Sequence, residues 1–291
     1  MRPIVLAAAL TACAAPASPG DPAPDAADPT MPPGAAPVLP APTGTCPALV
    51  PGDVMFAPAG IAPRMVKLAF DPAKQSGELL LYWHATGSGP AEAAYALGAT
   101  HAAIIARGGV IATPSSDPAA GQFEWFVVNG SPRTDDFVLA DEIVGCFAAA
   151  HRIDPTHVHS MGMSAGALQT TVLSFFRSRY IASVATYSGG LPSGFDPALQ
   201  NADNKFAALI FDGGASDAVF GVDFKAASEA YQARLVATGH FVALCDHGKG
   251  HAIPLDAAPS VAQFFTANPY GAWPSPYAAG LPASFPAYCA R

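Results

Sequence analysis

From residue 77 onward, two hydrophobic patterns follow each other along the chain. Short apolar runs bounded by Gly, Pro or Asp are typical of buried strands, and apolar residues at three- and four-residue spacing are typical of helices. We predict strands at residues 77–83, 110–114, 156–161, 181–187, 206–211 and 241–244, and helices at residues 91–107, 135–151, 165–177, 224–238 and 261–266. This alternation predicts an α/β fold with a mainly parallel central sheet and helices on both faces.

The predicted strand 156–161 and helix 165–177 are joined by residues 162–166, with the sequence Gly-Met-Ser-Ala-Gly. A serine on such a sharp strand-to-helix turn has a strained backbone and a hydroxyl that projects clear of both elements. The flanking glycines allow neighbouring chain segments to approach the turn closely. The pattern predicts Ser164 as a nucleophile.

A nucleophilic serine needs a general base, and on this turn the base is a histidine late in the chain. His251 lies after the last predicted strand, in the loop 250–254 with the sequence Gly-His-Ala-Ile-Pro. His247 is the alternative, but it stands closer to the strand, where its direction is more constrained. We favour His251, because a general base must first reach the hydroxyl.

The orienting acid should lie between the serine and the histidine in the chain. Asp217 follows the strand 206–211 in a glycine-containing loop, and we predict that it is the acid. Asp212 and Asp223 are alternatives, and any of the three could instead be an ordinary turn-forming aspartate.

A zinc cluster of Cys245, His247 and His251 is a further alternative. Their spacing is not helical and no second pair of ligands stands nearby, so we predict neither a metal nor an organic cofactor.

The developing oxyanion needs hydrogen-bond donors. The small-residue loop 84–89 follows the first strand, and we expect the backbone N–H of Thr86 to be one donor and that of Ala165 the other. Ser188 stands beside two glycines but lacks the elbow pattern, so we interpret it as structural. Several aromatic residues could line a pocket, although packing in the core is the commoner role; these are Trp83, Trp125, Trp273, Tyr270 and Tyr277.

The N-terminus has the pattern of an export signal. Arg2 precedes a short apolar stretch, residues 4–10, that is too short to span a bilayer. Leu-Thr-Ala-Cys at residues 10–13 resembles a bacterial lipobox, so we predict a signal peptide at residues 1–12 and lipidation of Cys13. An ordinary secretory signal is the alternative.

Residues 14–44 contain ten prolines and no aromatic residue, a composition that does not build a core. We predict an extended lipidated tether at residues 13–45 and one catalytic domain at residues 46–291. The tether would anchor the domain outside the cytoplasm on a membrane or the cell surface.

Four cysteines remain besides Cys13, and an even number in an exported chain favours two disulfides. Three pairings are possible. We favour Cys46 with Cys146 and Cys245 with Cys289; the alternative is that some are free thiols.

Charged residues make up only 12% of the chain and the net charge is −8. There is no basic cluster, so nucleic acid is not an expected partner.

Four segments together resemble the polyhydroxybutyrate depolymerase and feruloyl esterase-like group of α/β-hydrolases. They are residues 82–87 (Tyr-Trp-His-Ala-Thr-Gly), residues 153–155 leading into the serine turn, Asp217, and residues 250–254. The likeness covers residues 77–291. The group usually has Gly where this chain has Ala85 and often has His at the position of Asp212. The resemblance implies ester hydrolysis outside the cytoplasm through an acyl-enzyme.

We therefore expect a surface-tethered serine ester hydrolase acting on polyhydroxyalkanoate, feruloyl or acetyl esters. A peptidase or cutinase-like lipase is the nearest alternative, and a binding module without catalysis is the alternative from another class.

Overall fold

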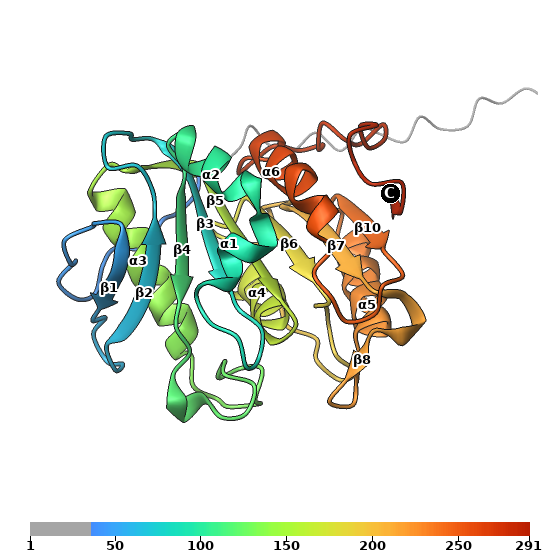
Figure 1. Cartoon of the computed structure of the whole chain (residues 1–291), viewed down its shortest axis with the longest axis horizontal. Coiled ribbons are helices and arrows are strands. Elements are labelled where there is room, and N and C mark those ends of the chain that lie inside the picture. The colour runs from blue at the N-terminus through green and yellow to red at the C-terminus, as the bar shows by residue number, and fades with distance from the viewer. Residues whose placement is uncertain (1–35) are drawn as a thin grey trace, which may run out of the picture. The chain divides into compact units, whose positions relative to one another are not determined.

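The computed structural model describes residues 36–291, which form a sheet flanked by helices on both faces (Figure 1). The strands are β1 (Gly52–Phe56), β2 (Arg64–Ala69), β3 (Gly77–Trp83), β4 (Val110–Pro114), β5 (Ile153–Met163), β6 (Ser183–Tyr187), β7 (Ala207–Asp212), β10 (Val242–Asp246) and β11 (Cys289–Ala290), and a separate two-stranded hairpin is made of β8 (Ala218–Val219) and β9 (Val222–Asp223). The helices are α1 (Glu92–Leu97), α2 (Ala99–Ala106), α3 (Asp135–Ala149), α4 (Ala165–Phe176), α5 (Phe224–Ala237) and α6 (Ala258–Ala267).

The main sheet has nine strands in the order β1-β2-β4-β3-β5-β6-β7-β10-β11. Its centre, from β4 to β10, is parallel throughout. The strands outside this centre, β1 and β2 at one end and β11 at the other, pair antiparallel. The carboxyl ends of the parallel strands therefore meet at one edge of the sheet, where loops can bring distant side chains together.

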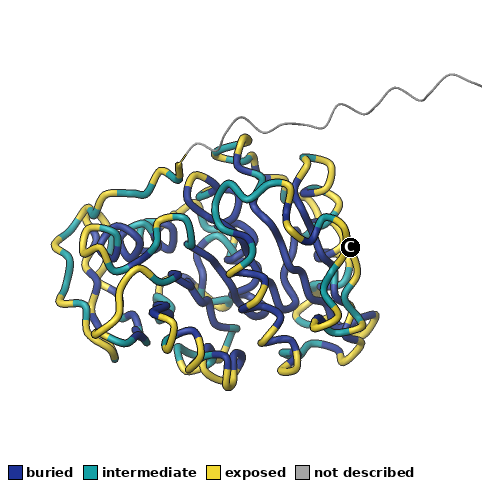
Figure 2. The backbone as a smooth tube through the Cα atoms, turned by 90° about the horizontal axis from the view of Figure 1, so that it is seen from above, coloured by how far each residue is buried: buried dark blue, intermediate teal, exposed yellow. Residues whose placement is uncertain are grey.

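Two hydrophobic cores separate the sheet from its helices. Alternate residues of β3 point into opposite cores, with Leu79 and Leu81 in one and Leu80 and Tyr82 in the other. The first core contains side chains of α3, α4 and α5, and the second those of α1, α2 and α6. Buried backbone accordingly runs through the middle of the molecule (Figure 2). Burial on both faces explains why the central strands are apolar runs.

The predicted fold class, a mainly parallel sheet between two helical layers, is confirmed. One helix differs from its prediction: residues 91–107 form two helices, because the chain turns at Gly98 with φ 51°. The antiparallel strands β1 and β2 were missed. They are short strands at one end of the sheet, separated by Pro58 and Pro63, and they lie before the first run that we interpreted as a strand.

Residues 38–44, which we expected in the extended tether, instead lie against the domain. The Val38 N–H donates to the Arg179 carbonyl (3.0 Å), and the buried Glu142 carboxylate accepts from the Thr43 and Gly44 N–H groups at 2.6 and 2.9 Å. The folded unit thus extends several residues before the predicted boundary, because a buried carboxylate on α3 needs donors. The predicted signal peptide and Cys13 lie outside the described residues.

The favoured cysteine pairing is confirmed. One disulfide joins Cys46 to Cys146 on α3, and the other joins Cys245 on β10 to Cys289 on β11. Within residues 36–291, no helix is long and apolar enough to cross a membrane.

Candidate active site

The turn between β5 and α4 has the expected strained form. Ser164 has φ 56° and ψ −121°, a backbone conformation that L-residues rarely adopt. Its N–H donates to the Tyr187 carbonyl on β6 (2.9 Å), which ties the turn to the neighbouring strand. A Cβ on Gly166 would overlap the Trp83 carbonyl, so only glycine allows α4 to approach β3 this closely.

Three side chains from separate loops form a hydrogen-bonded chain at the carboxyl ends of the strands. The Ser164 hydroxyl lies 2.8 Å from Nε2 of His251, and Nδ1 of His251 lies 2.7 Å from Oδ1 of Asp217. Ser164 and Asp217 are buried, whereas the His251 side chain is 18% exposed. The imidazole therefore bridges a buried carboxylate and a hydroxyl at the edge of solvent.

Asp217 is held as a carboxylate. Burial by itself would raise the pKa of Asp217, but hydrogen bonds from His251, the Gly213 N–H and the Ser188 hydroxyl outweigh burial and hold the pKa below its ordinary value. The Ser188 contact, at 2.8 Å to Oδ2, gives this serine a part in the site that we did not predict. The available signal was its position at the end of β6, beside the strands that carry the other groups.

The competing acids have other partners. One oxygen of Asp212 accepts the Gly214 N–H at 2.9 Å, and burial raises the pKa of this carboxyl. Asp223 accepts the Ala226 N–H at 2.9 Å and so caps α5. Neither contacts the imidazole of His251.

His247 does not reach the serine. Its Nδ1 accepts the Lys249 N–H at 3.2 Å, and burial lowers its pKa. The alternative of a zinc site at Cys245, His247 and His251 also lacks one of its ligands, because the Cys245 sulfur is bonded to that of Cys289.

Two loops meet at the site: the acid loop, which follows β7 and carries Asp217, and the histidine loop, which follows β10 and carries His251. Their backbones are in direct contact. The Gly250 N–H donates to the Gly213 carbonyl (2.9 Å), and a Cβ on Gly213 would overlap the Gly250 carbonyl. Because Gly213 also donates to Asp217, one residue holds both loops in register.

The loop after β3 is fixed by polar contacts that we did not predict. The Glu92 carboxylate accepts the Ala85 N–H (3.1 Å), the Glu124 carboxylate accepts the Gly87 N–H (3.2 Å), and the Trp125 indole donates to the His84 carbonyl (3.0 Å). Between these contacts stands Thr86. Its hydroxyl is buried and has no hydrogen-bond partner within the described part of the chain.

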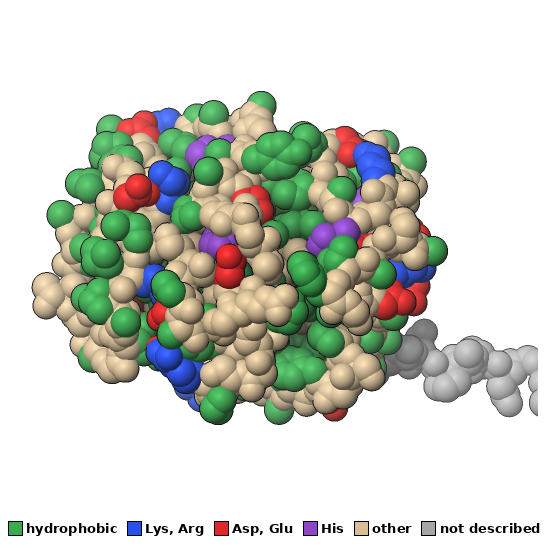
Figure 3. Space-filling model, turned by 60° about the horizontal axis from the view of Figure 1, so that its bottom comes forward, with side chains coloured by type: hydrophobic (Ala, Val, Ile, Leu, Met, Phe, Trp, Pro, Cys, Tyr) green, Lys and Arg blue, Asp and Glu red, His purple; other side chains and the backbone are tan. Residues whose placement is uncertain are grey.

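A cavity of about 170 Å³ opens beside Ser164, and both Thr86 and Ala165 line it. Ala165 is the first residue of α4, so its N–H has no partner within the helix. In the face that contains the carboxyl ends of the strands, hydrophobic side chains lie next to histidines (Figure 3). None of the five Trp and Tyr residues that we considered as pocket candidates lines this cavity; its aromatic walls are Phe123, Phe220 and Phe224.

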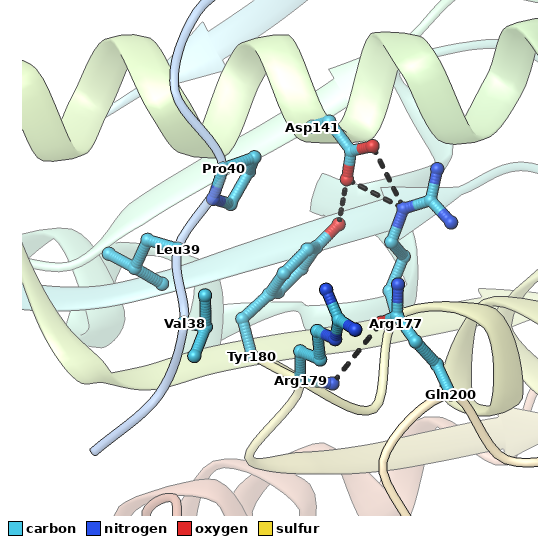
Figure 4. Close-up of a pocket in the computed structure, with 8 residues that line it drawn as sticks. All are labelled: Val38, Leu39, Pro40, Asp141, Arg177, Arg179, Tyr180 and Gln200. Carbon is cyan, nitrogen blue, oxygen red and sulfur yellow. Dashed lines mark hydrogen bonds and ion pairs between the residues drawn. The ribbon is translucent and has the colours of Figure 1, made fainter.

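A second hollow, of about 230 Å³, lies beside the N-terminal segment at residues 38–40 (Figure 4). Its carboxylate, Asp141, accepts hydrogen bonds from Nε of Arg177 (2.7 Å) and the Tyr180 hydroxyl (2.9 Å). Arg177 follows the last residue of α4, whose 12 residues span about 18 Å from Ser164. This hollow is therefore remote from the hydrogen-bonded chain.

No protein-family model matches the chain, and no curated protein sequence matches it. Several solved structures, however, are similar to it. Native pOPH superimposes with a TM-score of 0.66 at 14% identity, over 84% of this chain and 95% of pOPH. A ferulic acid esterase from Anaeromyces mucronatus, solved with ferulic acid, has a TM-score of 0.56 at 16% identity, over 76% of this chain and 90% of the esterase.

A thermostable esterase is similar as well, with a TM-score of 0.60 at 13% identity, over 75% of this chain and 62% of that protein. At identities this low the likeness concerns the fold. The parallel sheet, the strand-turn-helix at Ser164 and these neighbours agree: the chain has the α/β-hydrolase fold.

Proposed function

We propose that the protein is a serine-dependent carboxylic ester hydrolase. The observation that carries the proposal is the continuous hydrogen-bonded chain from Ser164 through His251 to Asp217. Nucleophile, base and acid in this arrangement are the parts that acyl transfer requires. The esterase names among the structural neighbours support the same reaction class.

In the first half of the reaction, the Ser164 oxygen attacks the ester carbonyl carbon while Nε2 of His251 takes the hydroxyl proton. Asp217 fixes the tautomer and stabilises the imidazolium. The bond between the carbonyl carbon and the alcohol oxygen then breaks, and the alcohol leaves with the proton from His251. Water attacks the acyl-enzyme in the same way, which releases the carboxylic acid and restores Ser164.

The negative charge on the carbonyl oxygen needs donors near Ser164. We assign this role to the N–H groups of Thr86 and Ala165, which both line the cavity. The buried hydroxyl of Thr86, which has no hydrogen-bond partner among residues 36–291, would be a further donor.

The purified full chain tests the proposal with short-chain p-nitrophenyl esters. We expect Ser164→Ala to lower kcat by about 10⁴-fold or more, because the covalent step is lost. Equal turnover by both proteins would overturn the proposal.

The alternative functions need their own assays. Parallel assays with a long-chain lipid ester and a peptide amide separate the esterase from a lipase or a peptidase. If the wild type does not react with an active-serine phosphonate, a binding module without catalysis is favoured.

His247 offers a matched control for His251, because both lie in the same loop. We expect His251→Ala to lower kcat by about 10³-fold or more and His247→Ala to change it by less than about threefold. The reverse result would assign the base to His247.

The two disulfides are typical of proteins outside the cytoplasm. We propose that Cys13 is lipidated and anchors the enzyme to a membrane. In bacterial cells fed radiolabelled palmitate, the wild type should become labelled and membrane-bound, whereas Cys13→Ser should not; labelling of both would refute the assignment.

A further inference from the structure

The cavity beside Ser164 has an apolar lining. Its only polar side chains are those of Thr86 and Ser164, and no charged side chain of the described residues lines it. The rest of the lining is apolar and includes three phenylalanines, Phe123, Phe220 and Phe224. Such a surface favours an uncharged hydrocarbon group, because a charge placed there would lose its hydration without a partner.

A second apolar cavity, of about 190 Å³, adjoins the first. The two share Val128, Leu168 and Pro192 as walls, and Val172 and Phe195 line the far part. Pockets that enclose drug-sized ligands measure about 300–1,000 Å³, and each cavity alone is smaller than that. Joined past the three shared side chains, they would suit one narrow chain several carbons long.

The position of His251 decides which half of an ester enters. Its Nε2 must protonate the leaving alcohol, so the alcohol must lie against the imidazole. His251 does not line either cavity, whereas Thr86 and Ala165, the proposed donors to the carbonyl oxygen, line the first. The acyl half is therefore the one that points into the cavities.

From this geometry, and resting on the proposed function, we propose that the two cavities form one acyl-binding channel for an unbranched, uncharged aliphatic chain, and that Phe220 determines this specificity. Such a channel would favour esters of medium-length aliphatic acids over acetyl esters and over esters with a charged acyl group.

Phe220 occupies an unusual place for an aromatic residue. It lies at the tip of the β8–β9 hairpin with φ 52° and 66% of its surface exposed. Positive φ at Phe220 and at Gly221 is what the two-residue turn of this hairpin requires, and the turn presents the Phe220 ring at its tip. Its ring meets that of Phe123 in an edge-to-face contact with centroids 5.8 Å apart, so the pair forms one wall of the cavity.

The hairpin is also anchored to the catalytic groups. Asp217 immediately precedes β8, and its carbonyl accepts the Phe224 N–H at 2.9 Å where the hairpin closes. The Phe224 ring packs on His251 with centroids 4.7 Å apart. Phe220 thus lies three residues after Asp217, at the tip of a hairpin whose base contacts His251.

The test uses the full-length protein and p-nitrophenyl esters that differ only in the acyl group: acetate, butyrate, octanoate and hemisuccinate. We expect kcat/KM for octanoate to exceed that for acetate by about 10-fold or more, since each well-bound methylene adds several-fold. Hemisuccinate should react at least about 10-fold more slowly than butyrate.

Two variants test whether the preference for octanoate over acetate arises in the two cavities. Val172→Phe fills the far cavity and should lower the octanoate-to-acetate ratio by about 10-fold, and Phe220→Ala should lower it by about fivefold. The matched control is Tyr95→Ala, an aromatic residue that is 62% exposed on α1 and does not line the channel; its ratio should equal that of the wild type. Unchanged melting temperatures establish that the variants fold.

A companion series keeps the butyryl group and varies the alcohol. If Val172→Phe and Phe220→Ala change the preference for the alcohol rather than the acyl group, the assignment of the channel is wrong. If the wild type hydrolyses all acyl lengths equally, the channel proposal fails while the esterase assignment stands. If no ester is hydrolysed in a Ser164-dependent manner, the proposed function itself fails.

Discussion

At the scale of single residues, the site depends on how Asp217 is kept ionised while fully buried. One carboxylate oxygen accepts from His251 and the other from Ser188 and Gly213. Charge-assisted hydrogen bonds of this kind are about twice as strong as neutral ones. Ser188 therefore acts as a positioning residue for the acid.

We predict that Ser188→Ala lowers the free energy of unfolding by about 1–3 kcal/mol at pH 7 and lowers kcat by about 10-fold. The folded-state pKa of Asp217 is depressed, so the stability it contributes is present above the unfolded value of about 3.9 and is lost as pH falls through the folded value. The difference between wild type and Ser188→Ala should consequently shrink below about pH 4.

Urea unfolding at pH 7 and at pH 3 measures this difference. Ser183→Ala is the control, because Ser183 is a buried serine at the other end of β6 whose partner is His159. That variant should leave kcat unchanged. A Ser188→Ala difference that is the same at both pH values would show that Ser188 does not act through the Asp217 carboxylate.

The candidate catalytic residues follow from the sequence to different degrees. Ser164 is recognisable because its turn is local in sequence, although Gly166 is required by the close approach of β3. Chain order leaves more than one aspartate and more than one histidine open, and only loop position favours Asp217 and His251. The end of a predicted strand was only a partial signal for Ser188, since its contact with Asp217 depends on β6 and β7 lying side by side.

At the scale of elements, the contact between the acid loop and the histidine loop sets the geometry of the site. Gly213 has an ordinary φ of −96°, so it is glycine for the close approach of Gly250 rather than for its own conformation. The two loops follow the adjacent parallel strands β7 and β10.

We predict that Gly213→Ala lowers kcat by about 100-fold, because the added methyl group pushes the His251 loop away and a displacement of about 1 Å is enough for such a loss. Gly89→Ala is a suitable control for the added methyl, because nothing lies within 4 Å of its Cβ position. Steady-state kinetics and thermal unfolding of both variants provide the measurement. A Gly213→Ala enzyme with normal kcat would show that the loops tolerate the methyl group.

Among the elements, the central strands were predictable because burial on both faces makes them apolar throughout. The break at Gly98 and the short strands β1 and β2 were not predictable. Their form depends on what packs beside them, such as α6 against α2 or β4 against β2. The hairpin β8–β9 is only four strand residues long and has no hydrophobic period to detect.

At the scale of the whole molecule, the two disulfides join different parts of the fold. Cys46 and Cys146 are separated by 100 residues and tie the N-terminal segment to α3, whereas Cys245 and Cys289 are separated by 44 residues and tie the C-terminus to β10. Cys245 of the second pair lies six residues before His251 in the chain.

We predict that replacing Cys46 and Cys146 with alanine lowers the free energy of unfolding by about 2–5 kcal/mol and leaves kcat within about twofold, since α3 carries no catalytic group. Replacing Cys245 and Cys289 should lower stability by a similar or slightly smaller amount, because the closed loop is shorter, and should also lower kcat. Denaturant unfolding and kinetics of the two double variants distinguish these effects. If kcat fell in the Cys46/Cys146 variant but not in the Cys245/Cys289 variant, the second disulfide would not be the one that supports the His251 loop.

The sequence by itself determined those features that short-range physics controls: the α/β alternation, the serine turn, and the pattern of an exported chain with four pairable cysteines. Tertiary structure alone decided which aspartate meets His251, that Ser188 supports it, that residues 38–44 belong to the folded unit, and that phenylalanines rather than tryptophans line the cavity. The reason is physical. Strand, helix and turn preferences act within a few residues, whereas hydrogen-bond partners and cavity walls come from segments that only the assembled sheet brings together.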